Sequence, residues 1–286
     1  MEFKSKDFTD AKRVLKLRKL SVGLTGRPDA NPVLNGIDLD IRAGETHCLV
    51  GESGSGKSVT SLAVMGLLPK DALEIQGGLI ELEGVEITNA KPAQMRELRA
   101  RRIAMIFQEP MTALNPVLRV GEQIEEVLNM HTDLSRAEAK KRTIDMMEQV
   151  HLPDVERIYS AFPHQLSGGQ RQRIMIAMAL ILDPDLLIAD EPTTALDVTT
   201  QLQILKLISE MQERHGTAVL FITHDMGVVA EIADTVSVMQ NGRIVERAPI
   251  RDLLTDPKEE YTRKLLAAVP KLGEMTGKDY PEPMKL

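Results

Sequence analysis

The sequence feature that most constrains this chain is a glycine-rich stretch at residues 51–58, which reads G-E-S-G-S-G-K-S. Glycine has no Cβ and accepts unusual backbone angles, so such a loop lets backbone N–H groups approach a concentrated negative charge. Lys57 adds a mobile cation for β- and γ-phosphates, and Ser58 adds a hydroxyl that binds Mg²⁺. An apolar strand is predicted before the loop, at residues 46–50, and a helix after it, at residues 58–68. Because this order aims a helix N-terminus at phosphate groups, we predict a phosphate-binding loop.

The composition is that of a globular chain and argues against several classes of protein. Of the 286 residues, 43% are hydrophobic and 27% are charged, as in ordinary globular domains. We find no apolar run of the roughly 18–20 residues that span a bilayer and no secretory signal in residues 1–13, and we expect a cytosolic protein. The lone Cys48 excludes an internal disulfide and a cysteine-only metal cluster, and we expect it in a buried strand. The net charge of −7 argues against a nucleic-acid groove.

Strands and helices alternate along the chain, which predicts an α/β fold with a mainly parallel sheet. The apolar runs at residues 103–107, 186–190 and 218–223 are typical of strands buried on both faces. A second group of strands has the pattern of a small antiparallel sheet. These strands are expected at residues 14–22, at 37–41, and at 79–83 after Gly77-Gly78.

The remaining periodicity predicts helices and one hairpin. Residues 120–152 are predicted to form a helical insert, in which Ser135 and Glu138 make a capping box for the next helix. Asn241-Gly242 predicts a two-residue hairpin turn. Single helices are expected at two further stretches, residues 92–102 and 252–269.

Two further motifs have the residue types of phosphate chemistry. Asp190 and Glu191 close the buried strand at 186–190, where one carboxylate can position Mg²⁺ and the other can orient or deprotonate a water. A surface acid pair at a strand end is the alternative interpretation. Residues 166–170 read L-S-G-G-Q and open a helix, so a serine hydroxyl and two glycine N–H groups form a second anion site. We therefore expect two phosphate-binding features in one chain.

The phosphate loop and the L-S-G-G-Q pentapeptide together resemble the ATP-binding cassette family, whose nucleotide-binding domains are ATPases that drive transport. The resemblance implies a P-loop NTPase fold with a RecA-like parallel core sheet, an antiparallel β-subdomain, and a helical subdomain at about residues 113–167. We assign residues 12–250 to this domain and residues 251–286 to a C-terminal extension of the peptide-importer type. In the family, two cassettes pack head to tail, and each ATP lies between one phosphate loop and the partner's L-S-G-G-Q.

The resemblance also implies roles for single residues. Gln108 matches the glutamine that contacts Mg²⁺ and the attacking water, and Asp197, in residues 195–197, matches the loop at the dimer seam. The implied catalytic residues are Glu191, His224, Gln108 and Lys57. The implied Mg²⁺ ligands are Ser58, Gln108 and Asp190. The implied ATP-binding residues are Gly51, Glu52, Ser53, Gly54, Ser55, Gly56, Lys57, Ser58, Val59, Gln108, Ser167, Gly168, Gly169, Gln170 and Asp197. Five histidines lack such support and are predicted to be structural: His47, His131, His151, His164 and His215.

The chain departs from the family at the aromatic residue that stacks on adenine. No Phe, Tyr or Trp lies between Phe8 and Phe107. We expect adenine to rest on Leu24 or on an arginine such as Arg18 or Arg27. Since base–aromatic stacking is worth about 1–3 kcal/mol per base, its loss predicts weak base selectivity.

Residues 103–116 and 260–270 resemble the oligopeptide, dipeptide and nickel importer subfamily. This implies uptake of peptides or similar small solutes, with two membrane permeases, a periplasmic binding protein that delivers the solute, and a position on the cytoplasmic face of the membrane. The second cassette is a copy of this chain or a different subunit, and the chain is a separate subunit, half of a fused pair, or a truncated piece. The alternatives are a nucleic-acid-associated cassette ATPase and an exporter ATPase. The short insert between Gln108 and Leu166 argues against the first, and the importer-like run at 103–116 against the second.

Overall fold

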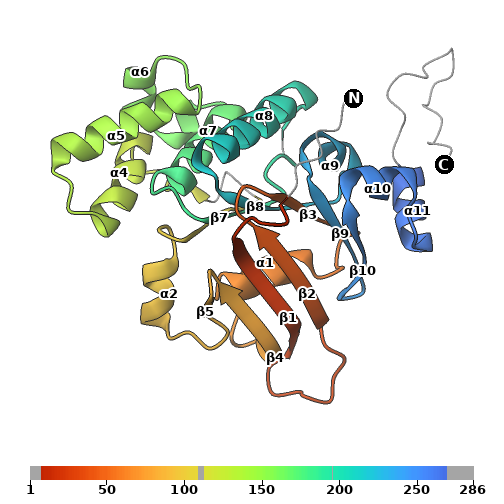
Figure 1. Ribbon diagram of the computed structural model, residues 1–286. Coiled ribbons are helices and arrows are strands. Elements are labelled where there is room, and N and C mark those ends of the chain that lie inside the picture. Colours follow the sequence, from red (N-terminus) through yellow and green to blue (C-terminus); the bar gives the residue numbers. More distant parts are fainter. Residues whose placement is uncertain (1–7, 109–112, 195, 269–286) are drawn as a thin grey trace, which may run out of the picture. The chain divides into compact units, whose positions relative to one another are not determined.

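The computed structural model describes residues 8–108, 113–194 and 196–268. The chain divides into two compact units, which we call the first and second unit. Figure 1 labels the helices and strands. The first unit comprises Met1–Ala90 and Leu220–Leu286, and the second comprises Lys91–Val219. The predicted glycine loop lies in the first unit, and the L-S-G-G-Q run lies in the second.

An antiparallel sheet of four strands forms one part of the first unit, in the order β2-β1-β4-β5. The strands predicted at 14–22, 37–41 and 79–83 are confirmed, and each is longer than expected. Gly77-Gly78, expected to precede a strand, lies inside β4 instead. A Cβ at Gly78 would lie 2.4 Å from the Lys19 carbonyl oxygen, so glycine is needed where the two backbones come close. The bounds are β1 Arg13–Leu24, β2 Leu34–Arg42, β4 Leu73–Leu82 and β5 Val85–Glu86.

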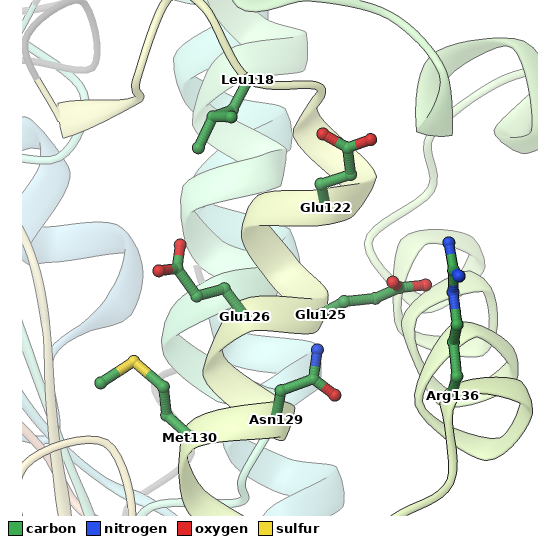
Figure 2. A pocket seen from close by; sticks show the side chains of 7 residues that line it. All are labelled: Leu118, Glu122, Glu125, Glu126, Asn129, Met130 and Arg136. Atoms are coloured by element: carbon green, nitrogen blue, oxygen red, sulfur yellow. The ribbon is translucent and has the colours of Figure 1, made fainter.

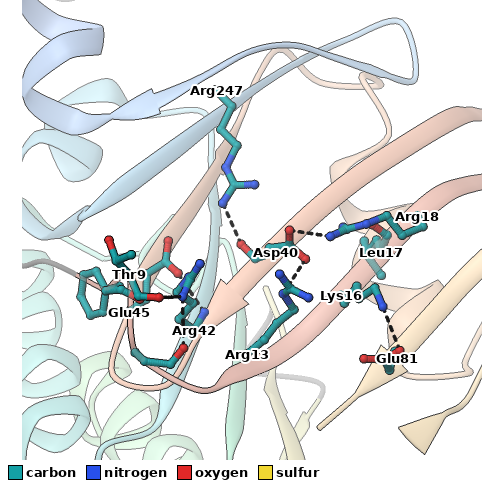
Figure 3. Close-up of polar contacts among 12 residues, drawn as sticks. Thr9, Arg13, Lys16, Leu17, Arg18, Asp40, Arg42, Glu45, Glu81 and Arg247 are labelled. Atoms are coloured by element: carbon teal, nitrogen blue, oxygen red, sulfur yellow. Dashed lines mark hydrogen bonds and ion pairs between the residues drawn. The ribbon is translucent and has the colours of Figure 1, made fainter. Parts of the chain in front are cut away.

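Ion pairs cover the polar face of this sheet (Figure 3). Arg18 donates to the Asp40 carboxylate and to the Leu17 carbonyl, each at 2.7 Å. Lys16 donates to Glu81 at 3.1 Å across the neighbouring strand pair. These pairs are partly buried at the sheet surface. Surface ion pairs contribute about 0–1 kcal/mol each, so their main effect is on side-chain orientation. The guanidinium of Arg18 is therefore held along the sheet.

A second sheet supports the glycine loop, and within the first unit its strand order is β10-β9-β3-β8. β3 and β9 run parallel, and β9 and β10 run antiparallel. The predicted hairpin is confirmed, because Asn241 and Gly242 both have positive φ, 48° and 73°. Cys48 is fully buried, as expected, and burial raises the pKa of its thiol. The bounds are β3 Thr46–Val50, β8 Ala218–Thr223, β9 Thr235–Gln240 and β10 Arg243–Pro249.

The helices of the first unit are shorter than the sequence pattern predicts. α1 spans Lys57–Val64, and the chain turns away at Gly66, which has a φ of 62°. The prediction that residues 252–269 are continuously helical is wrong, because the structure has two helices with Pro257 between them. Proline cannot donate a backbone hydrogen bond, so it interrupts a helix. Val269, the last residue of the predicted helical stretch, lies outside the described residues. The bounds are α9 Met226–Ile232, α10 Ile250–Thr255 and α11 Glu260–Ala267.

The second unit combines a parallel strand pair with a group of helices. β6 (Ile103–Ile106) pairs in parallel with β7 (Leu186–Asp190), as predicted for buried strands. α4 packs against α5, α6 and α7, and α7 also packs against α8 and β6. The Ser135–Glu138 capping box is confirmed at the start of α5. The helix bounds are α2 Pro92–Leu98, α4 Val120–His131, α5 Arg136–Gln149, α6 Val155–Tyr159, α7 Gly168–Leu180 and α8 Val198–His215, with a 3₁₀ turn at Pro163–Gln165.

The structure brings one correction to this unit. α2 ends at Leu98 rather than at residue 102, since Arg99 is extended and Ala100 has a φ of 67°. The helical insert predicted at 120–152 is confirmed, with its second helix beginning after the capping box. Among the described residues, no helix is both long enough and apolar enough to cross a bilayer.

Candidate nucleotide site

The glycine loop follows β3 and leads into α1, as the sequence predicts. Gly51 has a φ of 155°, and a Cβ there would lie 2.2 Å from the Met239 carbonyl oxygen. Gly56 has a φ of 110°, and its Cβ would lie 2.7 Å from a methyl of Leu34. Gly54 has a φ of 79° and open space around it. The three glycines thus permit a backbone that larger residues would displace, which keeps the loop's N–H groups available to an anion.

Lys57 lies at the centre of the loop. Its Nζ donates to the carbonyl oxygens of Gly51 at 2.7 Å and Glu52 at 3.0 Å, and only 5% of the residue is exposed. These bonds fix the ammonium group against the first two residues of the glycine loop. The lysine is therefore held within the loop before any phosphate arrives.

The Ser55 hydroxyl is an orphaned polar group in the same loop. It is buried and makes no hydrogen bond to any described residue, although its backbone N–H donates to Glu52 at 3.2 Å. A buried hydroxyl without a partner is costly, so its presence indicates a site that a ligand completes. The loop thus fits a polyphosphate, both by its glycine cradle and by this donor.

The hairpin between β9 and β10 presses against the loop from one side. The N–H of Gly242 donates to the Ser55 carbonyl at 2.9 Å, and that of Asn35 donates to the Gly242 carbonyl at 2.8 Å. Leu34, which touches Gly56, is paired with Val22 in the antiparallel sheet. The end of β1 therefore lies one strand away from the glycine loop.

This arrangement bears on the residues expected to carry adenine. Leu24 ends β1 with 38% of its surface exposed, two residues from the Val22–Leu34 pair. Arg18 is engaged by Asp40 and the Leu17 carbonyl, and its pKa is raised by the hydrogen bond to Asp40. Leu24 is thus an exposed apolar platform near the loop, whereas the Arg18 side chain is already committed to the sheet.

His224 also lies in the first unit, directly after β8. It is exposed, and the next residue, Asp225, accepts from the N–H groups of Gly227 and Val228 at the start of α9. His47, by contrast, is fully buried, with its Nε2 2.9 Å from the Ser237 hydroxyl. Burial lowers the pKa of His47, although the neighbouring Glu45 partly opposes the shift. His47 is thus a buried structural histidine, whereas the role of His224 at the site stays a prediction.

The second unit brings together three of the predicted catalytic and metal-binding residues. Asp190 ends the fully buried β7 with 6% exposure, and Glu191 follows with a φ of 47°, in the left-handed region. Gln108, at the exit of β6, donates from Nε2 to Oε2 of Glu191 at 3.0 Å. The Thr194 hydroxyl donates to the same oxygen at 3.0 Å. Left-handed residues other than glycine are uncommon and often mark functional sites, and Glu191 is such a residue. Its carboxylate is oriented by Gln108 and Thr194.

The L-S-G-G-Q run forms the N-terminus of α7. Ser167 is the N-cap, its hydroxyl accepts from the Gln170 N–H at 3.3 Å, and the Gln170 side chain accepts from the Ser167 N–H at 3.0 Å. Gly169 lies against the start of α8, because a Cβ there would be 2.7 Å from the Thr200 methyl. Asp197 caps α8 and accepts from the N–H and the hydroxyl of Thr200, which lower the pKa of its carboxyl group. The pentapeptide and Asp197 are therefore linked through Thr200.

Three residues in these contacts escaped the sequence interpretation. Thr194 and Thr200 each lie three residues after an acid that they contact, a spacing that indicates local capping. Tyr261 on α11 accepts a hydrogen bond from the Glu52 N–H at 3.1 Å. No local pattern predicts that contact, because it joins positions 209 residues apart. Ala195, and residues 109–112 of the run that resembles peptide importers, lie outside the described residues.

Comparisons with known proteins agree with this geometry. The sequence profile of the ABC transporter family matches residues 34–194. The glutathione import ATP-binding protein GsiA of Escherichia coli strain K12 is 50% identical over 285 residues, which cover 96% of this chain and 45% of GsiA. The probable peptide ABC transporter ATP-binding protein y4tR of Sinorhizobium fredii is 50% identical over 257 residues, covering 90% of this chain and 77% of that protein.

A solved structure has the same fold. The dimeric ATP-binding cassette MJ0796, in a post-hydrolysis state with ADP and Pi, superposes with a TM-score of 0.72 at 27% identity, over 83% of this chain and 99% of that one. The likeness confirms the predicted α/β cassette fold. This chain spans about half the length of GsiA, 45%. The glycine loop, the L-S-G-G-Q helix and the family match together show that the chain belongs to the ABC transporter family.

Proposed function

We propose that this chain is the ATP-binding and ATP-hydrolysing subunit of an importer for peptides or similar small solutes. The observation that carries the proposal is the carboxylate of Glu191, oriented by Gln108 and Thr194 directly after the buried Asp190. Such a carboxylate can orient and deprotonate a water that attacks the γ-phosphate. The glycine loop with Lys57 supplies the phosphate cradle on which the reaction depends.

Each residue of the site has a separate role in the proposed binding and hydrolysis of ATP. Lys57 and N–H groups of the loop after Glu52 bind and hold the phosphates, and the Ser55 hydroxyl gains a partner. Glu191 holds the proton of the attacking water, and Gln108 keeps the acid turned toward it. In this mechanism, His224 lies beside the γ-phosphate and stabilises the negative charge that develops there during the reaction. The N-terminus of α7, led by Ser167, caps a nucleotide bound to a second cassette.

Mg²⁺ fits the donor set of this chain. When bound, it would offset phosphate charge during transfer, as in other ATPases. The residues proposed to hold it are Ser58, Gln108 and Asp190, which offer one hydroxyl, one amide and one carboxylate. Mg²⁺ favours oxygen ligands, and several of these come from phosphate groups and water. A small number of protein ligands is therefore enough.

The nature of the solute is proposed from the relatives. GsiA is an import protein for glutathione, a tripeptide, and y4tR is a probable peptide transporter component. The proposal therefore extends to a periplasmic binding protein that captures a short peptide and to two permeases that carry it. It places this chain on the cytoplasmic face of the membrane, as a peripheral subunit. The same relatives favour import over the nucleic-acid and exporter alternatives.

A groove beside α4 is the proposed docking surface for one permease (Figure 2). Glu122, Glu126 and Met130 project from α4, and Arg136 lies on the neighbouring α5. Met130 is 72% exposed and Val117, just before the groove, is 75% exposed. Acidic side chains beside exposed apolar ones suit a short amphipathic segment with basic residues. The groove is lined by Leu118, Glu122, Glu125, Glu126, Asn129, Met130 and Arg136.

The proposal of ATP hydrolysis is tested with the variant Glu191→Gln. The amide keeps the shape of the side chain but cannot accept a proton, so kcat for ATP should fall by about 10²-fold or more. ATP binding should persist, and a dimer should accumulate on a sizing column with ATP. Glu156→Gln, which changes an exposed acid on α6, is the matched control and should behave as wild type. Full turnover by Glu191→Gln would remove this residue from its role.

Docking to the permeases is tested with charge reversal. Glu122→Lys with Glu126→Lys should lower co-sedimentation with membranes that contain the permeases and leave the ATPase rate of the free subunit unchanged. Glu231→Lys on α9 is the control for net charge, since this exposed acid lies in the first unit. Normal membrane binding by the double variant would show that the permease docks elsewhere.

Base recognition is tested by nucleotide competition. If Leu24 supports adenine only by apolar contact, ATP and GTP should bind with similar affinity, within about tenfold. Leu24→Tyr should strengthen ATP binding, because it restores an aromatic face. A preference of a hundredfold or more for ATP in the wild-type protein would contradict a platform made of leucine alone.

A further inference from the structure

The hydroxyl of Tyr261, on α11, lies against the glycine loop from far along the chain. It accepts a hydrogen bond from the backbone N–H of Glu52, with 3.1 Å between the two atoms. The Glu52 carbonyl in turn accepts from Lys57 Nζ at 3.0 Å and from the Ser55 N–H at 3.2 Å. Tyr261 therefore contacts a loop residue whose carbonyl also accepts from the lysine and from the turn of the loop.

The N-terminal end of α11, which carries Tyr261, is anchored by hydrogen bonds and by buried side chains. Both carboxylate oxygens of Glu246, on β10, accept from the chain just before α11, from the N–H of Lys258 at 2.7 Å and of Glu259 at 3.0 Å. The next residue after Tyr261, Thr262, is fully buried, and Leu266 is 1% exposed. Acids that accept from a helix N-terminus stabilise it, so α11 is fixed at the end that carries the tyrosine.

The same hairpin anchors α11 and touches the loop. β10 supplies Glu246, and the hairpin turn supplies Gly242, whose N–H donates to the Ser55 carbonyl at 2.9 Å. The carbonyl of Met239, on β9, lies within 2.2 Å of where a Cβ at Gly51 would be. The C-terminal part of the first unit thus bonds the glycine loop at its second residue, through Tyr261, and at its fifth residue, through Gly242. It also approaches the loop closely at Gly51.

We propose that Tyr261 is a positioning residue of the phosphate-binding loop, and that it couples the docking of α11 to nucleotide affinity. The inference rests on the proposed nucleotide binding. Tyr261 restrains the Glu52 peptide, and the Glu52 carbonyl restrains Lys57, so the loop is already ordered when phosphates arrive. A preordered loop loses less conformational entropy on binding and so binds more tightly. By linkage, bound nucleotide must stabilise the docked position of α11 to the same extent.

The test compares Tyr261→Phe with the wild-type full chain. Phenylalanine keeps the ring and removes the acceptor of the Glu52 N–H. Hydrogen exchange at the Glu52 amide, followed by mass spectrometry without nucleotide, should become faster. The Kd for ATP in EDTA buffer, where hydrolysis is absent, should rise about three- to tenfold, as expected for one net hydrogen bond. The KM should rise with it, while kcat stays within about twofold, because Tyr261 does not touch the reacting atoms.

Tyr159→Phe is the matched control, since its hydroxyl donates to Glu125 in the second unit. It removes one phenol hydrogen bond, in which the phenol is the donor rather than the acceptor, and should leave both the exchange at Glu52 and the Kd unchanged. An unchanged Kd in Tyr261→Phe, whether or not the exchange at Glu52 speeds up, would overturn the inference. If wild-type protein itself does not bind ATP, the proposed function fails, and the exchange at Glu52 still reports whether the contact forms.

A second measurement requires no variant and covers the case in which Tyr261→Phe unfolds. Saturating ATP in EDTA buffer should slow hydrogen exchange in the wild-type peptide that contains residues 258–263. The peptide from α5 in the second unit provides a reference. Unchanged exchange at residues 258–263 when ATP is bound would show that α11 and the glycine loop are not coupled.

Discussion

Gln108 Nε2 donates a hydrogen bond to Oε2 of Glu191 at 3.0 Å, across 83 residues of sequence. The contact joins the exit of one parallel strand, β6, to the exit of its neighbour, β7. Because parallel strands end on the same edge of a sheet, side chains that follow them meet there. The Thr194 hydroxyl shares the same carboxylate oxygen at 3.0 Å, so Glu191 is oriented from two sides.

This contact predicts a kinetic effect of Gln108→Leu. Leucine fills a similar volume but donates no hydrogen bond, so Glu191 loses one of the donors that orient it. We expect kcat for ATP to fall by about tenfold to a hundredfold, within the range that a positioned general base contributes. The KM should change little. Steady-state ATPase assays measure both constants, with Gln203→Leu on α8 as a control, and a wild-type kcat in Gln108→Leu would contradict an orienting role.

The contact between Gly169 and Thr200 predicts a loss of stability in Gly169→Ala. The new Cβ would lie 2.7 Å from the Thr200 methyl, closer than carbon atoms pack. We expect the free energy of unfolding to fall by about 1–3 kcal/mol, as for other overpacked sites. Gly168→Ala is the matched control, since its Cβ would meet only a Leu196 methyl at 3.6 Å.

A second substitution provides a rescue. Thr200→Ser removes the methyl but keeps the hydroxyl that bonds Asp197 at 2.7 Å. Gly169→Ala combined with Thr200→Ser should therefore recover most of the lost stability, measured by urea denaturation. Independent, additive effects in the double variant would show that the methyl is not the obstacle.

The backbone of the glycine loop predicts that its glycines tolerate alanine unequally. Gly51→Ala would place a Cβ 2.2 Å from a backbone carbonyl, which cannot move as a side chain does. Gly54→Ala meets nothing within 4 Å and only adds the strain of a φ of 79°, about 1–2 kcal/mol. Isothermal titration should show ATP binding abolished in Gly51→Ala and only weakened in Gly54→Ala, and equal losses would contradict the assigned loop conformation.

The anchor of α11 predicts a pH dependence through Glu246. Burial opposes its charged form, but the hydrogen bonds from the N–H groups of Lys258 and Glu259 outweigh it, so the pKa of Glu246 is lowered. A lowered pKa in the folded state means that the acid stabilises the protein fully above its unfolded pKa near 4.5. This contribution is lost as the pH falls through the lower folded value.

The measurement compares thermal melting of Glu246→Gln and wild type at several pH values. At pH 7 the variant should be less stable by about 1–3 kcal/mol, the range for hydrogen bonds to a charged group. The difference should stay constant down to about pH 5 and shrink below it. Glu231→Gln, which changes an exposed acid on α9, controls for net charge. A difference that grows as the pH falls would contradict the sign of the shift.

Local sequence signals predicted much of the fold, because each depends on nearby residues alone. The strands at 46–50, 186–190 and 218–223 were predicted to the residue, since their apolar runs are continuous. The Asn241-Gly242 turn and the Ser135–Glu138 capping box follow from backbone conformation and side-chain length. The bounds of α1, α2 and α11 were less well predicted, because helix ends are decided by left-handed residues and prolines in competition with the apolar pattern.

The residues of the candidate site were also named from sequence, while their contacts were not. The glycine loop, Asp190–Glu191 and L-S-G-G-Q are contiguous motifs, so the order of residues by itself determined that this chain has the parts of a nucleotide site. Only the tertiary structure decided that Gln108 orients Glu191, that Thr200 joins Gly169 to Asp197, and that Tyr261 bonds the Glu52 backbone. Two of these contacts, Gln108 with Glu191 and Tyr261 with Glu52, join residues 83 and 209 positions apart, and strand pairing and hairpin packing bring them together at distances that no local pattern encodes.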